Sequence, residues 1–399
     1  MRTYKPVDTA FSNSLPVGIS ETNQIGSSLA GSNILILNDH LPYTGIGKST
    51  FQTFNRMREA GADVDMLLAH QDEEYNSDAV ITQKRPRFLR GIKKHGLLFE
   101  LLSYFYFPNN APDGYSLYHV SSQMLARYCN FVEPSVVTCC DSIAFRVDGN
   151  HDGVSQYLLR KHFDDIGKAK RVIFVSEHAR NDFLNLFDYD PDRTVVIYNG
   201  IDRETFTPGD KYQEREKLGL PQDAPIILNV GSENPRKNMP TLMKSLEILR
   251  RNVPEARLLR VGKMTDETGR VIDDLGISGS VDYRSNVSES ELVSCYRAAD
   301  VFMFPSYYEG FGMPVLEAFA AELPVVSSSA TSLSEVAGDA ALLSEPFDAD
   351  SMAIDVERVL SDSELRQTLV KKGNDRVSRF SWDKAARETM KLYCDVLGD

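Results

Sequence analysis

The segment DVFMFPSYYEGFGMPVLEAFAAELPVVSSS, residues 300–329, predicts a strand, a glycine-containing loop, a helix and a second strand in succession. The apolar run before Pro305 is typical of a buried strand in a parallel sheet. Gly310 and Gly312 give the loop backbone its freedom, and Pro314 fits the first turn of the helix that follows. This order of elements is the repeating unit of a parallel, doubly wound sheet.

The same unit recurs on both sides of a polar connection that runs from Asp202 to Asp223. Before it, strands are predicted at 33–38, 63–69, 116–120, 135–140, 171–176 and 194–199. After it, strands are predicted at 225–231, 256–262, 280–284, 300–306 and 323–329. The chain is therefore expected to be an α/β protein with two Rossmann-like domains facing a central cleft, and a ligand at the carboxyl ends of both sheets.

These elements define the expected domain boundaries. Residues 1–32 are rich in Ser, Asn, Gly and Thr and predict a loose N-terminal extension. We expect the first domain at 33–205 and the second at 206–379. A C-terminal helix within 380–399 is expected to pack back toward the N-terminal domain.

The composition and net charge of the chain argue against several classes of function and site. The 399 residues include 44 Lys and Arg against 57 Asp and Glu, a net charge of −13, which argues against broad nucleic-acid binding. Five cysteines without a C-x-x-C pair argue against a disulfide framework or a structural zinc site. Neither a transmembrane run nor a secretory signal is evident, so we expect a cytoplasmic protein.

The loop and helix start within 300–329 predict an anion site. Free backbone N–H groups at a helix start attract an anion, and glycines allow it to approach closely. Glu309 and Glu317 lie eight residues apart on either side of this site. Their carboxylates would accept hydrogen bonds from hydroxyl groups, as a sugar and a ribose flanking a diphosphate require. The alternative is an ordinary turn with two surface glutamates.

The EGFGMPVLEA string resembles the E-x7-E segment of retaining GT-B glycosyltransferases of the group 1, or family 4, type. The resemblance extends from about Asn33 to Trp382 and includes VIYNGID (196–202), GSENPRKN (231–238) and FSW (380–382). It implies a nucleotide-sugar donor on the C-terminal domain, an acceptor on the N-terminal domain, retention at the anomeric carbon and no required metal or cofactor.

The resemblance also assigns residues to roles. Those implied in catalysis are Arg236, Lys237, Glu309 and His119. Those implied in donor binding are Gly45, Gly47, Gly231, Gly310, Phe311, Gly312, Met313 and Glu317, and Asp141 is implied at the acceptor. Two positions depart from the family pattern: Ser232 stands where many members carry Arg, and Cys140 stands where many carry His.

The form of the 231–238 loop favours a particular donor. Its P-R-K-N string resembles that of mannosyltransferases in the family, so GDP-mannose is the first expectation and a UDP-hexose the second. The acceptor is expected to be a hydroxyl group of a glycan or of a lipid-linked molecule. An Arg fork and a Lys ammonium beside the leaving diphosphate would stabilise its growing charge.

Three other functions stay open. YTGIGKST (43–50) nearly matches the phosphate-binding loop of NTPases, but Pro42 occupies the position of its first glycine. A nucleotide-sugar epimerase would share the two-domain fold. A non-catalytic sugar-nucleotide-binding subunit is compatible with Ser232 and Cys140. The D-x-D strings Asp63–Asp65 and Asp348–Asp350 are expected to be structural, the second as a helix N-cap.

A basic and then apolar segment occupies residues 84–107. It reads KRPRFLRGIKKHGLLFELLSYFYF, with five basic residues between 85 and 94. Such a stretch can lie on an anionic membrane, which suggests peripheral binding to the inner face of a membrane. The alternative is a helix that packs its apolar face into the core and leaves its basic residues in water.

Overall fold

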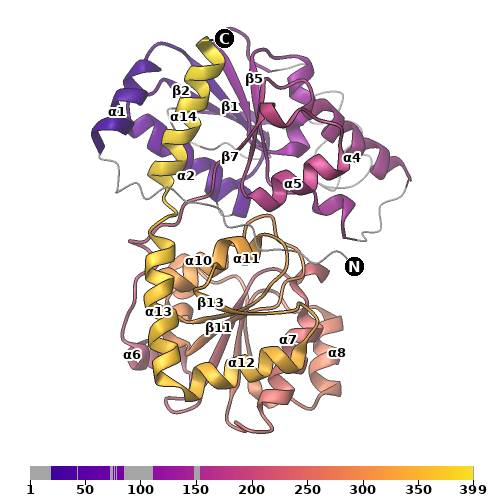
Figure 1. Ribbon diagram of the computed structural model, residues 1–399, viewed down its shortest axis with the longest axis vertical. Helices are drawn as coiled ribbons and strands as arrows, with labels where there is room; N and C mark the ends of the chain where they lie inside the picture. Colours follow the sequence, from indigo (N-terminus) through magenta and orange to yellow (C-terminus); the bar gives the residue numbers. More distant parts are fainter. Residues whose placement is uncertain are drawn as a thin grey trace.

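The computed structural model of the chain describes residues 19–42, 44–71, 75, 77, 79–84, 111–147 and 153–398. The chain forms two α/β halves, each built around a parallel sheet (Figure 1). The predicted pair of Rossmann-like domains is confirmed. Within the described residues, no helix is both long enough and apolar enough to cross a membrane.

The N-terminal sheet has seven parallel strands in the order β3-β2-β1-β4-β5-β6-β7. They are β1 (Ile34–Asn38), β2 (Val64–Gln71), β3 (Val80–Lys84), β4 (Leu117–Val120), β5 (Ser135–Cys139), β6 (Arg171–Phe174) and β7 (Thr194–Val196). The winding direction reverses between β1 and β4, where Ile36 pairs with His119. In an open α/β sheet this reversal opens a crevice at the carboxyl ends of the two strands.

The C-terminal sheet repeats this arrangement with six parallel strands in the order β10-β9-β8-β11-β12-β13. They are β8 (Ile226–Val230), β9 (Arg257–Val261), β10 (Val281–Arg284), β11 (Val301–Phe304), β12 (Val325–Ser328) and β13 (Ala341–Ser344). Here the winding reverses between β8 and β11, where Val301 pairs with Ile227. The loops that follow these two strands are 231–238 and 305–312.

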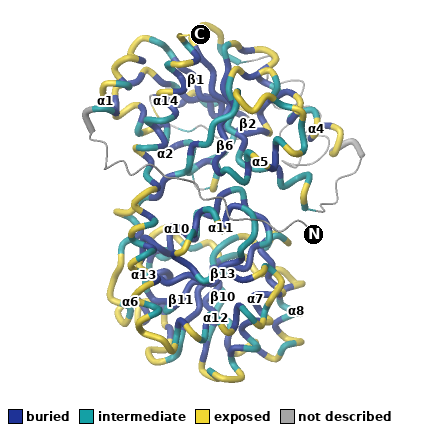
Figure 2. The backbone as a smooth tube through the Cα atoms, in the orientation of Figure 1, coloured by how far each residue is buried: buried dark blue, intermediate teal, exposed yellow. Residues whose placement is uncertain are grey.

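Helices cover both sheets, and the backbone at the centre of each half is buried while the outer helices carry most of the exposed residues (Figure 2). The N-terminal half contains α1 (Ile19–Ser28), α2 (Gly45–Glu59), α4 (Gly153–Ile166) and α5 (Glu177–Leu186). The C-terminal half contains α6 (Lys211–Leu218), α7 (Met239–Leu249), α8 (Asp266–Asp274), α9 (Glu289–Ala298), α10 (Met313–Ala320), α11 (Ser332–Ala337), α12 (Ala349–Ser361) and α13 (Ser363–Val377). The final helix is α14 (Trp382–Gly398).

Four elements differ from the sequence expectations. Strands β3 and β13, each at an edge of its sheet, were not predicted. Helix α6 lies within the polar connection, where Asp210 caps its start and Gly219 ends it in a left-handed conformation. Helix α1 occupies the described part of the expected loose extension, and packing against α14 accounts for its order.

Helix α14 packs on the N-terminal domain although it follows the C-terminal domain in the chain. It runs beside α2 and α1 (Figure 1). Trp382, Ala386, Met390 and Tyr393 are buried in the core under β1 and β4. The core of the first domain therefore includes residues from both ends of the described chain.

The chain crosses between the domains at two places that touch one another. Gly200 belongs to the first crossing and Trp382 to the second. A Cβ atom added to Gly200 would lie 2.1 Å from the backbone nitrogen of Trp382 and 2.4 Å from the carbonyl carbon of Ser381. A side chain at position 200 would therefore force the two crossings apart.

Gly200→Ala is expected to lower the free energy of unfolding by about 1–3 kcal/mol, because the added methyl group collides with backbone atoms that cannot rotate away. Gly269→Ala in α8 is the matched control, since a Cβ atom there meets nothing within 4 Å. Thermal unfolding of both variants checks this expectation. A Gly200→Ala protein that melts with or above the Gly269→Ala protein would contradict it.

Candidate active site

A cavity of about 270 Å³ lies between the two domains, at the carboxyl ends of the strands where both sheets reverse. Its walls come from α2, β4 and β5 on one side and from the 231–238 and 305–312 loops on the other. The sequence-predicted residues that line it are Gly45, His119, Asp141, Arg236, Lys237, Glu309, Gly310, Phe311, Gly312 and Met313. Residues from both domains, far apart in the sequence, therefore meet at one cleft.

The Glu309 carboxylate joins the two C-terminal loops. Its Oε1 atom accepts a hydrogen bond from Lys237 Nζ at 2.5 Å, and its Oε2 atom accepts one from Arg236 Nη1 at 2.5 Å. Arg236 Nη1 also donates to the carbonyl oxygen of Tyr308 at 3.1 Å. One carboxylate thus holds two cations against the mouth of the cavity.

Burial and charge act in opposite directions on this group of three. Burial alone would raise the pKa of Glu309, but Lys237 and Arg236 outweigh it and lower the pKa below its ordinary value. Burial lowers the pKa of Lys237, and the neighbouring Arg236 charge adds to that effect against the opposing influence of Glu309. The Glu309 carboxylate and the Lys237 ammonium thus each oppose the effect of burial on the other.

Local backbone geometry fixes the positions of Arg236 and Lys237. They lie in a single turn of 3-10 helix, Pro235–Lys237, which begins at the Asn234 side chain and ends at Asn238 in a left-handed conformation with φ 58°. The Asn238 amide donates to the carbonyl oxygens of Pro305 at 3.1 Å and Pro346 at 2.5 Å. The turn is therefore tied directly to the end of β11.

Helix α10 starts at the cleft without a side-chain cap. Gly312 occupies its N-cap with φ 109°, a conformation that favours glycine. A Cβ atom at Gly312 would also lie 2.7 Å from Leu333 Cδ2. Pro314 has no N–H and the Val315 N–H donates to the Gly312 carbonyl oxygen at 3.0 Å, so the Met313 N–H is the group at this helix start that an anion in the cleft can use.

Glu317 lies in the second turn of α10 and is 8% exposed. Its Oε2 atom accepts a hydrogen bond from the Tyr296 hydroxyl at 2.8 Å. Burial raises the pKa of Glu317, while Lys48 and the Tyr296 hydrogen bond oppose the rise. Tyr296 therefore holds one carboxylate oxygen, and Glu317 lies behind the residues that line the cavity rather than among them.

Gly310 allows the domains to approach closely at the cleft. A Cβ atom at this position would lie 2.4 Å from the carbonyl oxygen of Cys140 and 3.2 Å from Asp141 Oδ2. Asp141 Oδ1 accepts from the Ile143 backbone N–H at 3.2 Å, so this carboxylate caps a turn while its other oxygen faces the C-terminal loop. Burial raises the pKa of Asp141, against an opposing effect of Arg236.

The two glycines at the start of α2 differ in what they permit. A Cβ atom at Gly47 would lie 1.9 Å from the carbonyl oxygen of Leu41, whereas one at Gly45 would meet nothing within 4 Å. The Gly47 N–H donates to the Thr44 hydroxyl, which caps the helix.

Lys48 reaches across the cleft to Glu289 at 2.9 Å. This geometry does not favour the NTPase alternative, because the Thr44 cap and the Glu289 pair occupy groups that a phosphate-binding loop would use.

His119 is buried on β4, and both of its ring nitrogens have partners. Nδ1 lies 2.5 Å from the Tyr393 hydroxyl of α14, and Nε2 lies 2.8 Å from the Thr138 hydroxyl. Burial lowers the pKa of His119 to about 4, so the imidazole is neutral at neutral pH. The ring is therefore suited to fixing the backbone of β4 beside the cavity rather than to transferring a proton.

Packing accounts for the positions of three further predicted residues. The Phe311 side chain is buried in the C-terminal core, 5.9 Å from the Phe380 ring centroid. Met313 packs against the cores of both domains. Gly231 ends β8 with φ 148°, and a Cβ atom there would lie 3.4 Å from Lys237 Cε.

Polar contacts between the domains were not predicted from the sequence. The Glu335 carboxylate of α11 accepts from the backbone N–H groups of Glu177 at 2.8 Å and His178 at 3.0 Å, at the start of α5. The Tyr308 hydroxyl donates to Asp182 at 2.7 Å. These partners are more than 120 residues apart, so no local pattern could have indicated them.

The described residues do not contain a cluster of three His, Cys, Asp or Glu side chains that could hold a metal ion. Asp348 caps α12 by accepting from the Ser351 N–H at 2.9 Å, as predicted for that D-x-D string. Asp65 of the other string accepts from the Tyr115 hydroxyl at 3.1 Å. Both aspartates thus have structural partners.

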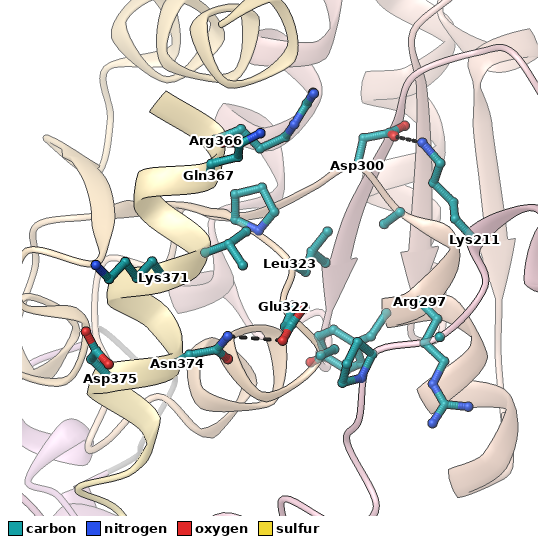
Figure 3. Close-up of a pocket in the computed structure, with 17 residues that line it drawn as sticks. Lys211, Arg297, Asp300, Glu322, Leu323, Arg366, Gln367, Lys371, Asn374 and Asp375 are labelled. Atoms are coloured by element: carbon teal, nitrogen blue, oxygen red, sulfur yellow. Dashed lines mark hydrogen bonds and ion pairs between the residues drawn. The ribbon is translucent and has the colours of Figure 1, made fainter. Parts of the chain in front are cut away.

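A larger groove, of about 660 Å³, lies elsewhere on the C-terminal domain, between α13 and the end of α9 (Figure 3). Four of its polar side chains pair with one another: Lys211 with Asp300 at 2.9 Å, and Asn374 with Glu322 at 3.1 Å. None of the sequence-predicted site residues lines this groove. The cavity between the domains is therefore the better candidate, although it is smaller.

The membrane-binding expectation for 84–107 cannot be placed on the structure, because residues 85–110 lie outside the described part of the chain. It stays a prediction from the sequence.

Two family models match the chain, and together they span most of it. The model of group 1 glycosyl transferases matches residues 210–376, and the model of glycosyltransferase family 4 matches residues 43–205. Each of these two segments falls within one of the two α/β halves of the structure.

Curated relatives and solved structures agree with the family models. The chain is 27% identical to an O-antigen chain mannosyltransferase B of Escherichia coli, over 88% of this chain and 96% of that protein. Sucrose-phosphate synthase from Thermosynechococcus elongatus has a similar fold, with a TM-score of 0.75, 23% identity, and coverage of 92% of this chain and 99% of that one. The Anabaena protein HepE, solved with UDP and glucose, superposes with a TM-score of 0.72 at 18% identity, covering 91% and 99%.

Glu309→Gln is expected to lower the free energy of unfolding by about 3–5 kcal/mol, because Lys237 then stays buried without its counter-ion. Adding Lys237→Met should recover part of that loss, since the uncompensated ammonium is removed. Urea unfolding of the single and double variants measures the difference.

Glu247→Gln is the matched control, because Glu247 pairs with Lys244 and Arg251 at the surface and its loss should cost no more than about 1 kcal/mol. A double variant that loses the full sum of its two single variants would contradict the coupling.

Proposed function

Since the chain belongs to the group 1, or family 4, glycosyltransferases, we propose that it transfers a hexose from a nucleoside diphosphate sugar to a hydroxyl group of a glycan or lipid-linked acceptor. The proposal includes retention of configuration at the anomeric carbon. Mannose is the first choice of sugar, supported by the P-R-K-N string of the 231–238 loop and by the similarity to an O-antigen mannosyltransferase.

One observation carries this proposal: the Glu309 carboxylate holds Arg236 and Lys237 beside the uncapped start of α10, inside a cavity shared by both domains. Two cations and a helix N-terminus form an anion site of the strength that a diphosphate requires. A carboxylate at the same place offers acceptors for sugar hydroxyls. A site with both features matches a sugar diphosphate better than either a simple phosphate or a neutral sugar.

The proposed mechanism places the growing charge of the leaving group on this anion site. Breaking the bond between the sugar and the diphosphate transfers negative charge to the leaving oxygen. Arg236 and Lys237 stabilise that charge without transferring a proton, and they do so best in the transition state. The Arg236 guanidinium uses Nη1 for Glu309 and Tyr308, which leaves its other N–H groups for a phosphate.

The acceptor hydroxyl attacks the face that the leaving group vacates, so the configuration is retained. The leaving phosphate oxygen takes the proton of that hydroxyl. His119 is not needed as a base in this scheme, which agrees with its two engaged nitrogens and its lowered pKa. Its role is to hold β4 against the cavity, together with Thr138 and Tyr393.

Further roles follow from the positions of the carboxylates. Glu317 binds the ribose through the oxygen that Tyr296 does not occupy, and Glu309 contacts the transferred sugar. Asp141 faces the C-terminal loop from the acceptor domain, which suits contact with the acceptor. Gly45 lies next to open space at the cavity wall and permits close approach of the donor.

A UDP-hexose is the alternative donor, in line with the UDP bound to the HepE protein of similar fold. The proposed enzyme requires no metal, because the basic loop supplies the countercharge to the diphosphate. Its proposed place of action is the cytoplasm, with peripheral attachment to the inner face of a membrane through 84–107.

The proposal is tested by incubating the chain with GDP-mannose, UDP-glucose, UDP-galactose and UDP-N-acetylglucosamine, with and without glycan and lipid-linked acceptors. Acceptor-dependent release of one nucleoside diphosphate is expected, and it should persist in excess EDTA. NMR of the product should show the anomeric configuration of the donor.

Other outcomes point to the alternatives. A loss of activity in EDTA that Mn²⁺ or Mg²⁺ restores would contradict metal independence. Conversion of one nucleotide sugar into another would indicate an epimerase, and binding without turnover of any donor would indicate a non-catalytic subunit.

Glu317→Gln is expected to weaken binding of the product nucleotide by roughly tenfold or more, because a charge-assisted hydrogen bond to the ribose is lost. Glu309→Gln should weaken nucleotide binding less than Glu317→Gln does, and its main effect should be slower transfer. Calorimetric titration with GDP and UDP, beside a transfer assay, separates the two effects.

Tyr296→Phe is the matched control for this comparison, since it removes the hydrogen bond to Glu317 and keeps the carboxylate. Equal losses of nucleotide affinity in the two glutamate variants would rule out the division of roles.

A further inference from the structure

A fully buried arginine lies under the proposed diphosphate site. Arg260, on β9, has no exposed surface. The C-terminal domain contains a second arginine of this kind, Arg215, whose guanidinium pairs with the Asp300 carboxylate at 2.6 Å. Arg260 differs, because no carboxylate of the described residues lies within the 4.0 Å of an ion pair with it.

All the hydrogen-bond partners of Arg260 are neutral. Its Nη2 atom donates to the carbonyl oxygens of Gly231 at 2.7 Å and Ser232 at 3.4 Å. Its Nη1 atom donates to the carbonyl oxygen of Val261, and Nε lies 3.3 Å from the Met239 sulfur. The hydrogen bonds are satisfied, but the positive charge is not compensated by an ion pair.

The acidic side chain that acts on Arg260, Glu233, already accepts hydrogen bonds from other groups. Burial lowers the pKa of Arg260, and Tyr283 and Glu233 only partly oppose it. The Glu233 carboxylate accepts from the Thr265 N–H at 2.7 Å and from the Tyr283 hydroxyl at 2.7 Å. Burying an unpaired charge is expensive, so a sequence that keeps one there has a use for it.

The position of Arg260 beside the 231–238 loop indicates what its buried charge does. Gly231 and Ser232 begin the 231–238 loop, and Lys237 at the end of that loop lies close enough for the Arg260 charge to lower its pKa. The structure also makes room for the guanidinium: a Cβ atom at Gly262 would lie 2.6 Å from Nη1. Glycine at 262, with φ 156°, thus permits this packing.

A positive charge at the carboxyl end of a parallel strand favours the binding of a phosphate there, for an electrostatic reason. Parallel strands present carbonyl oxygens at their carboxyl ends, and these partial negative charges repel a phosphate. Arg260 turns the carbonyl oxygens of Gly231 and Ser232 toward itself and adds a full positive charge beneath them. The low-dielectric surroundings strengthen the effect of that charge on a neighbouring anion.

We propose that Arg260 is a positioning residue for the donor diphosphate, which holds the Gly231–Ser232 backbone and supplies a positive charge from beneath the loop. The inference rests on the proposed function, because it takes the 231–238 loop as the diphosphate site. Ser232 stands where many family members carry an arginine. The inference assigns the charge of that arginine to Arg260 on the neighbouring strand β9, which is then the third cation of the site beside Arg236 and Lys237.

The test is calorimetric binding of GDP, GMP, UDP and UMP to the full chain and to Arg260→Met. Loss of the buried charge should lower the ratio of diphosphate to monophosphate affinity by roughly tenfold, because the diphosphate carries the larger negative charge. Arg260→Lys keeps the charge and should keep this ratio within about threefold of wild type. If Arg260→Met does not fold, Arg260→Gln takes its place with the same expectation.

Arg250→Met is the matched control, since Arg250 also donates to a backbone carbonyl, that of Ala256 at 2.6 Å, which lies outside the 231–238 loop. It should leave the affinity ratio unchanged. A residue with a purely structural role would lower both affinities by the same factor, so an unchanged ratio in Arg260→Met would overturn the inference. Failure of the wild-type chain to bind any of the four nucleotides would instead overturn the proposed function and the inference with it.

Discussion

The geometry of the cleft depends on one carboxylate that neutralises two cations. Arg236 and Lys237 follow β8, Glu309 follows β11, and these strands are neighbours because the sheet reverses its winding between them. The ion pairs therefore connect the two loops at the place where the fold itself opens a crevice. Without a carboxylate at 309, two like charges would be forced together in a poorly solvated position.

Close contact between the domains follows from the same loop. Gly310 allows the Cys140 carbonyl oxygen to approach, and the Tyr308 hydroxyl reaches Asp182. The residues on either side of Glu309 thus bind the N-terminal domain, while Glu309 itself holds the cations of the C-terminal domain. A change in the spacing of the domains would therefore be transmitted directly to the charged centre of the cleft.

Local sequence patterns predicted the central strands, the glycine turns and the resemblance to a family, because these depend on residues close together in the chain. They did not predict β3, whose last three residues are polar, β13, which has no β-branched or aromatic residue, or α6, whose residues are almost all polar. His119 could be placed on its strand, but its partner Tyr393 is 274 residues away, so its buried and neutral state became evident only in the structure. Arg260 was missed because its neighbours Leu258, Leu259 and Val261 mark the strand as apolar core.

The packing of α14 on the N-terminal domain has a consequence for synthesis of the chain on the ribosome. The strands of the first sheet, Ile34–Asn38 to Thr194–Val196, emerge long before Trp382–Gly398. Until those last residues appear, the nascent first domain lacks the side chains that complete its core and the hydroxyl group that binds His119. The second domain has all its strands by Ser344 and its last core residue, Phe380, precedes α14. The N-terminal domain is thus translated first but completes its core last. The cleft between the two domains forms only after both of them have been translated.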